Sequence, residues 1–160
     1  MKNQIVSTIK MSFLFLILIV AQTVFAQSGK MMPKDGSTVK MSKYSFAETV
    51  DILTGAIEEQ NLMVIHIVDA QKMLRMAGKK VKGMKQIFYF HPKYMRKVME
   101  ANNEATIQIP LKFIVMEKPN GKVIVRYFMP SKVLAGYSGE EAIAKELDGL
   151  VDKIVHEITN

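Results

Sequence analysis

Residues 111–128 read LKFIVMEKPNGKVIVRYF, and this stretch decides the class of the fold. Two apolar runs, Leu111–Glu117 and Lys122–Phe128, flank the turn sequence Pro-Asn-Gly at positions 119–121. An Asn-Gly pair accepts the positive φ angles that a tight hairpin turn requires. The stretch therefore predicts two adjacent antiparallel strands.

Upstream of this hairpin, apolar runs bounded by turn residues predict three further strands, at Ser37–Tyr44, Leu62–Val68 and Met84–Phe90. Ser45 and Glu48 are spaced as a capping box, and apolar residues then recur at helical intervals to about Gln60.

A second box, from Ser138 to Glu141, predicts the start of a last helix. Two short helices are expected as insertions, at Asp69–Met76 and Pro92–Met99. The resulting order is β-α-β-β-β-β-α, which indicates an α+β fold with a mostly antiparallel sheet of about five strands.

The N-terminal residues have the composition of a secretory signal peptide. Lys2 and Lys10 precede the apolar run MSFLFLILIV at 11–20, and small residues follow, so cleavage is expected after Ala26. This predicts export, most simply to a bacterial periplasm, with residues 27–36 as a flexible leader and 37–160 as one domain. An uncleaved membrane anchor is the alternative, because residues 11–29 carry no charge and approach the length of a membrane span.

Charge is distributed unevenly along the chain. The formal net charge is +7, and loss of the two lysines of the signal peptide leaves +5. Residues 71–99 contain nine cations and no acid, including Lys79, Lys80, Lys82, Lys93, Arg96 and Lys97. Export argues against nucleic acid as the partner, which leaves an anionic small molecule, a lipid headgroup, an acidic protein, or a merely solubilising face. The chain has no Cys, so thiol chemistry and disulfides are excluded.

The predicted strands are apolar on both faces, whereas two long helices can cover only one. A homodimer partner, a ligand, or the two short helices must then cover the other face. We expect an apolar pocket lined by Phe88, Phe90, Phe113 and Phe128, with His91, Tyr94 and Met95 beside it and the basic segment at its rim. A ligand with an apolar body and an anionic group would fit both features.

His91 has two interpretations. It precedes Pro92, a favourable first helical residue, so its imidazole can cap the short helix. Met95 and Met99 follow at four-residue intervals, and imidazole with thioether also suits copper or haem. A methionine stripe at helical spacing is, however, ordinary core filling, and no cofactor is expected on the first interpretation.

Several short motifs fall in a familiar order: Ser45-Phe46-Ala47-Glu48-Thr49-Val50, Asp69 after the second strand, Phe90-x-Pro92, Ile109-Pro110-Leu111 and Gly121-Lys122-Val123. Over about residues 37–137 the chain thereby resembles the domain-of-unknown-function family 302. The resemblance implies a TATA-box-binding-protein-like arrangement and no established activity. That family often has Asp-His where this chain has Asp69-Ala70, and Gly-Asn-Pro where it has Phe90-His91-Pro92, so His91 belongs to this chain or to a subgroup.

No arrangement of nucleophile, base or paired carboxylates that would support catalysis is visible in the sequence. The favoured hypothesis is a non-enzymatic exported binding or interaction protein that forms a homodimer and holds an amphipathic anionic ligand. The alternative is a periplasmic copper or haem carrier that uses His91, Met95 and Met99.

Overall fold

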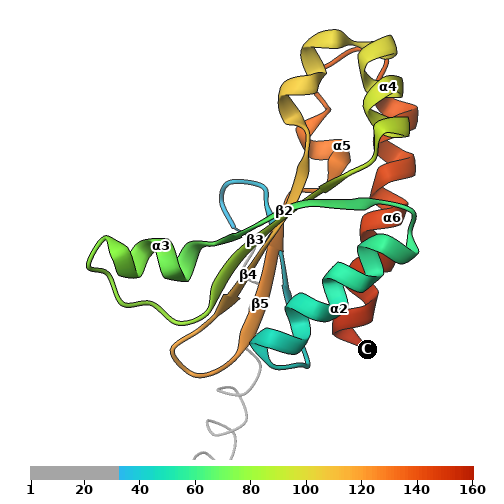
Figure 1. Cartoon of the computed structure of the whole chain (residues 1–160). Helices are drawn as coiled ribbons and strands as arrows, with labels where there is room; N and C mark the ends of the chain where they lie inside the picture. The colour runs from blue at the N-terminus through green and yellow to red at the C-terminus, as the bar shows by residue number, and fades with distance from the viewer. Residues whose placement is uncertain (1–32) are drawn as a thin grey trace, which may run out of the picture. The chain divides into compact units, whose positions relative to one another are not determined.

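The computed structural model describes residues 33–160 and contains one five-stranded sheet (Figure 1). Its spatial order is β1-β5-β4-β3-β2, and all neighbouring strands are antiparallel. The strands are β1 (Thr38–Met41), β2 (Met63–Asp69), β3 (Met84–Phe90), β4 (Leu111–Glu117) and β5 (Val123–Tyr127). The α+β class, the number of strands and the β-α-β-β-β-β-α order are confirmed.

The β4–β5 hairpin forms, but with a different turn from the one that Asn-Gly suggested. Among the residues of this turn, 119–121, only Gly121 has a positive φ, of 79°. The Gly121 N–H donates to the Lys118 carbonyl and the Lys118 N–H donates to the Lys122 carbonyl, which closes a three-residue loop. A loop of this length combines an ordinary turn with one left-handed residue, so Gly121 alone needs the special conformation.

Two helices, α2 (Phe46–Glu59) and α6 (Glu141–Thr159), lie side by side on one face of the sheet (Figure 1). Beneath them an aromatic row crosses three strands, with the rings of Tyr89 and Phe113 stacked at 4.7 Å and that of Tyr127 edge-on to Phe113 at 5.3 Å. All three side chains are buried. Burial of such large apolar rings makes this face the core.

The starts of the two long helices differ. At α2 the Ser45 hydroxyl accepts from the Glu48 N–H and the Glu48 carboxylate accepts from the Ser45 N–H, as the capping box predicted. The predicted box at Ser138 is wrong, because α6 begins at Glu141 after Gly139, whose φ is 85°. That left-handed glycine ends the preceding turn and prevents Ser138 from lying at the helix start.

Four shorter helices complete the described chain: α3 (Ala70–Met76), α4 (Pro92–Ala101), the 3-10 helix η1 (Asn103–Gln108) and α5 (Pro130–Val133). The first two were expected from the sequence and the last two were not. Helix α3 contacts β3 at the end of the sheet, whereas α4 packs on η1 and α6. The short helices therefore do not cover the second face of the sheet, which was one of the three predicted possibilities.

The expected signal peptide, its cleavage site and the alternative anchor lie outside the described residues. The end of the expected leader lies inside them, where Asp35 accepts from the Ser37 N–H and forms an ion pair with Arg126 on β5. Within residues 33–160, no helix combines the length and the apolarity needed to cross a bilayer.

Candidate functional site

The sheet face opposite α2 and α6, which we call the open face, carries apolar side chains together with Lys112 and Arg126 and is not buried. Strand register places Phe88 beside Lys112, Ile114 beside Arg126, and Met116 beside Ile124 on this face. None of these side chains is buried within the described chain, whereas their neighbours Ile87, Phe113 and Val125 on the other face are fully buried. The open face is therefore the part of the sheet that can receive a partner or a ligand.

A hollow of about 500 Å³ lies at one end of this face. It is formed where η1, the start of β4 and the β5–α5 connection meet. Its lining is mainly apolar and consists of Phe88, Ile107, Gln108, Ile109, Pro110, Leu111, Lys112, Phe128 and Val133. The size falls in the range of small-molecule sites, which are typically apolar with few polar groups.

Of the residues in the described part of the chain that line the hollow, only Lys112 carries a formal charge. Its ammonium nitrogen lies 5.8 Å from the centre of the Phe88 ring, within the range of a cation–π contact. On the other side, the Gln108 side-chain N–H donates to the Tyr137 hydroxyl at 3.1 Å, which fixes that amide at the wall. The hollow thus combines aromatic surface with one cation at its edge.

Only two of the four phenylalanines predicted to line a pocket do so. Phe88 and Phe128 line the hollow, and Phe128 is 37% exposed. Phe113 is fully buried under the two long helices, because it alternates with Lys112 and Ile114 and so points to the opposite face. Phe90 is buried at the end of β3, with its ring against that of Tyr94. The prediction is therefore wrong for Phe113 and Phe90.

His91 caps α4, as the structural interpretation predicted: its Nδ1 accepts from the Lys93 N–H at 3.0 Å. Tyr94 is buried and Met95 packs half-buried against the core, whereas Met99 is 50% exposed. The cap of α4 therefore explains why a histidine stands at position 91, and packing against the core explains the methionine at position 95. Among the described residues, no group of three His, Asp or Glu side chains could hold a metal ion.

Tyr94 and Lys97 connect α4 to α6 through one carboxylate. The Tyr94 hydroxyl donates to Glu146 at 2.9 Å and the Lys97 ammonium lies 2.7 Å from its other oxygen. The hydrogen bonds from Lys97 and then Tyr94 lower the pKa of the Glu146 carboxyl, while burial and this carboxylate raise the pKa of Tyr94. Tyr94 and Lys97 are thereby engaged in holding two helices together.

The basic segment does not form the predicted rim. Lys93, Arg96 and Lys97 lie on α4, and Arg96 pairs with Glu100 on the same helix at 3.7 Å. Lys79, Lys80 and Lys82 lie on the loop after α3, where Lys82 approaches Glu117 at 3.8 Å. None of the six lines the hollow. Lys112 supplies the cation of the hollow instead. The sequence alone did not single it out, because its position beside Phe88 depends on the β3–β4 register.

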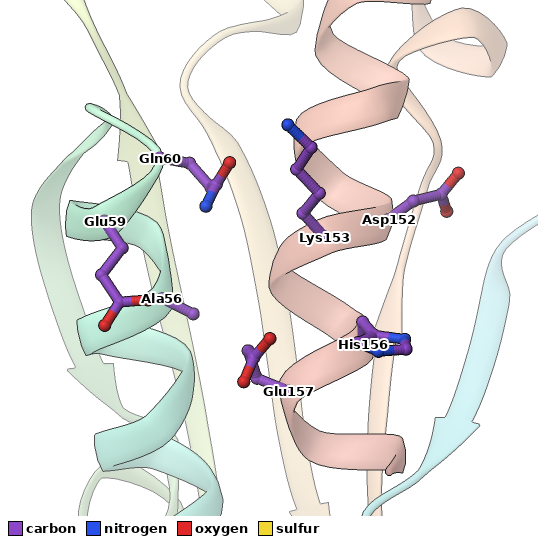
Figure 2. Close-up of a pocket in the computed structure, with 7 residues that line it drawn as sticks. All are labelled: Ala56, Glu59, Gln60, Asp152, Lys153, His156 and Glu157. Carbon is purple, nitrogen blue, oxygen red and sulfur yellow. The ribbon is translucent and has the colours of Figure 1, made fainter.

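A second hollow lies between α2 and α6 and is lined by Ala56, Glu59, Gln60, Asp152, Lys153, His156 and Glu157 (Figure 2). Gln60 and Glu157 project into the gap between the two helices, whereas Asp152 and His156 lie on the side of α6 that faces away from α2 in this view. Within residues 33–160, Ala56 is the only apolar residue of this lining, and the charged side chains of both signs are exposed to solvent. The aromatic hollow is therefore the better candidate for a ligand site.

Comparisons with known proteins identify the fold and the family. The profile of the family described as "Domain of unknown function DUF302" matches residues 38–158. A solved structure described as "Crystal structure of uncharacterized conserved protein DUF302 from Bacillus stearothermophilus" is similar with a TM-score of 0.64 at 14% identity. The alignment covers 77% of this chain and 95% of that one, so nearly all of that crystallised chain has this fold. No curated protein matches the chain.

Proposed function

This chain belongs to the DUF302 family, and we propose that its domain is a non-enzymatic binding module that holds an amphipathic anionic molecule in the aromatic hollow. The observation behind the proposal is the pairing of Phe88 and Lys112 across β3 and β4, next to Phe128 on an uncovered apolar surface. The apolar body of the ligand would displace water from the two rings. Its anionic group would lie at the ammonium of Lys112.

Magnitudes favour a ligand that is mainly apolar. Covering an aromatic side chain removes on the order of 100 Å² from water and contributes roughly 2–3 kcal/mol at about 25 cal/mol per Å². An exposed ion pair contributes only about 0.2–1 kcal/mol. The rings would therefore supply most of the affinity, and Lys112 would select for the anionic group.

Two fluorescent probes that differ by one charge test this division of roles. Anilinonaphthalene sulfonate has an apolar body and a sulfonate, and N-phenyl-1-naphthylamine has nearly the same body without it. With the domain of residues 33–160 we expect both to bind. Phe88→Ala should weaken both by about thirtyfold, and Lys112→Glu should weaken only the sulfonate, by about fivefold.

Matched controls lie in the same sheet, on β5 and in the loop before it, but outside the hollow. Ile124→Ala removes a half-buried apolar side chain from the open face, and Lys122→Glu reverses an exposed charge on the hairpin. Neither should change probe affinity by more than about twofold. Equal loss in Phe88→Ala and Ile124→Ala, or no loss in either, would contradict the proposed site.

The open face also supports the proposal that the protein is a homodimer. Met41 is 54% exposed on β1 beside the half-buried Ile124, so the apolar surface reaches the edge of the sheet. Light scattering on the purified domain measures its mass in solution. A monomer at all concentrations would exclude the dimer and leave the ligand as the occupant of this face.

A further inference from the structure

The residues from Ala70 to Gly83, which we call the arm, project beyond the sheet on the side away from α2 and α6 (Figure 1). Ala70 is buried, and Leu74 is half-buried on the same face of α3. The Gln71 side-chain N–H donates to the Val81 carbonyl at 3.2 Å, which ties the helix to the loop behind it. One face of α3 therefore packs against the rest of the domain, and the opposite face, which we call the free face, is exposed to solvent.

Two methionines occupy the free face of the arm. Met73 is 60% exposed and Met76 is 82% exposed. They are three residues apart, so they lie next to each other on the helix surface. Methionine is among the residues most often buried, and two neighbouring exposed ones indicate a contact surface.

Cations surround these methionines. Lys72 and Arg75 are exposed on α3, and Lys79 and Lys80 are exposed on the loop that follows. Within residues 33–160, none of these four forms an ion pair. Two acids lie at the base of the arm: Asp69 caps α3 by accepting from the Lys72 N–H, and Glu117 lies 3.8 Å from Lys82 at the other end. The free face therefore exposes two apolar side chains that are surrounded by four cations without ion-pair partners in residues 33–160.

We infer that the arm docks on an anionic lipid bilayer. In this arrangement Met73 and Met76 enter the boundary between headgroups and acyl chains, and the four cations contact lipid phosphates. Basic residues close to an anionic membrane each strengthen binding by about fivefold, and exposed apolar side chains add to this when they leave water. This inference concerns a surface separate from the aromatic hollow and does not depend on it.

The size of the surface favours a bilayer over an acidic protein. A stable protein interface buries about 800 Å² on each partner around well-packed anchors. The free face of a seven-residue helix offers two flexible thioether side chains, far below that area. A fluid lipid surface needs no shape complementarity and accepts flexible side chains of this kind.

Co-sedimentation with vesicles tests the lipid and the methionines together. We use the domain of residues 33–160, with vesicles of phosphatidylcholine alone or with about one third phosphatidylglycerol. Binding is expected only to the anionic vesicles, and Met73→Gln with Met76→Gln should weaken it about tenfold or more. The control Met63→Gln with Met99→Gln also removes two exposed apolar side chains, which are 49% and 50% exposed and lie outside both the arm and the aromatic hollow, and should bind as the unchanged domain does.

A second pair of variants tests the charge. Lys79→Glu with Lys80→Glu should reduce binding by at least about thirtyfold, since two contacts of about fivefold each are lost and reversed. Lys132→Glu with Lys145→Glu changes the net charge equally on α5 and α6 and should have less than a threefold effect. Equal loss in both pairs would overturn the assignment to the arm. Binding that depends on the lysines but not on Met73 and Met76 would also overturn it, because the domain would then be attracted to the headgroups by charge alone, without insertion of the arm.

A tryptophan reporter measures insertion directly, because the chain contains no Trp. Met76→Trp should shift its emission to shorter wavelength on anionic vesicles, as the ring moves from water into the bilayer boundary. Met99→Trp places the same reporter at a site that is 50% exposed on α4, outside the aromatic hollow, and should not shift. No shift at position 76, or equal shifts at both positions, would refute docking through the arm.

Discussion

Glu140, the residue before α6, allows a test of what a buried carboxylate without a hydrogen-bond partner costs this fold. Its side chain is 1% exposed, and neither carboxylate oxygen has a hydrogen-bond partner among the described residues. Burial, and next the negative charge of Glu141, raise the pKa of the Glu140 carboxyl. The ionised group should therefore destabilise the folded state, and Glu140→Gln should relieve the cost.

The size of the gain follows from two opposing effects. An unsatisfied buried polar group costs about 1–3 kcal/mol, and more when charged. Glu140 precedes the first turn of α6, where the helix dipole offsets about 0.3–1 kcal/mol of that cost. We expect Glu140→Gln to raise the free energy of unfolding at neutral pH by about 1–2 kcal/mol and Tm by roughly 3–8 °C.

The pH dependence provides the second measurement. Because its pKa is raised in the folded state, Glu140 binds its proton more tightly there than in the unfolded chain, where the pKa is about 4.5. Stability from this group is thus highest at acidic pH and falls as the pH rises from about 4.5 through the folded pKa. Urea unfolding of both proteins at several pH values isolates this effect, since every other group cancels in the difference.

The control is Glu141→Gln, which makes the same chemical change at an exposed position one residue later. Glu141→Gln removes a charge that is favourable in the first turn of α6 but that also repels the Glu140 carboxylate, and these opposing effects should leave its stability within about 0.5 kcal/mol of the unchanged protein. A Glu140→Gln variant that is less stable at neutral pH, with a pH profile parallel to that of the unchanged domain, would refute the reasoning. It would mean that the carboxylate has a partner in solution.

Three further predictions concern local structure. Ser45→Ala should lower the free energy of unfolding by about 1 kcal/mol through loss of the α2 cap, whereas Ser138→Ala should change it by less than about 0.5 kcal/mol; chemical denaturation measures both. Gly83→Ala would place a Cβ 2.7 Å from the Phe46 ring and should lower the free energy of unfolding by about 1–3 kcal/mol. Gly149→Ala lies within α6 at a position where a Cβ meets no neighbouring atom, and it should stabilise the domain by up to about 1 kcal/mol. Equal Tm values for the two variants would contradict this contrast. His91→Asn should keep α4 capped, so Tm should stay unchanged or rise. Titration calorimetry with Cu(I) should give the same heat of binding for this variant and for the unchanged domain. Loss of copper binding in the variant would support the carrier hypothesis instead.

The candidate site shows why the sequence identified the kind of surface but not its residues. Alternation predicted that both faces of β3 and β4 are apolar, and they are. It could not tell which face the long helices would choose, so Phe88 and Phe113 looked equivalent. Packing of α2 and α6 on one side buried Phe113 completely and left Phe88 open beside Lys112. The basic run was likewise predicted as one surface, but the chain reverses at β3 and divides it between the arm and α4.

The sequence by itself determined what depends on neighbours in the chain: the strands around Gly121, the cap of α2 at Ser45 and the cap of α4 at His91. In each, the donor and acceptor are at most four residues apart, so the residue types alone specify the bond. Tertiary structure decided what depends on distant segments, namely the open face, the position of Lys112 and the free face of the arm. Those features arise when residues far apart in the chain exclude water from one surface and leave another uncovered, and no local pattern encodes which surface will be covered.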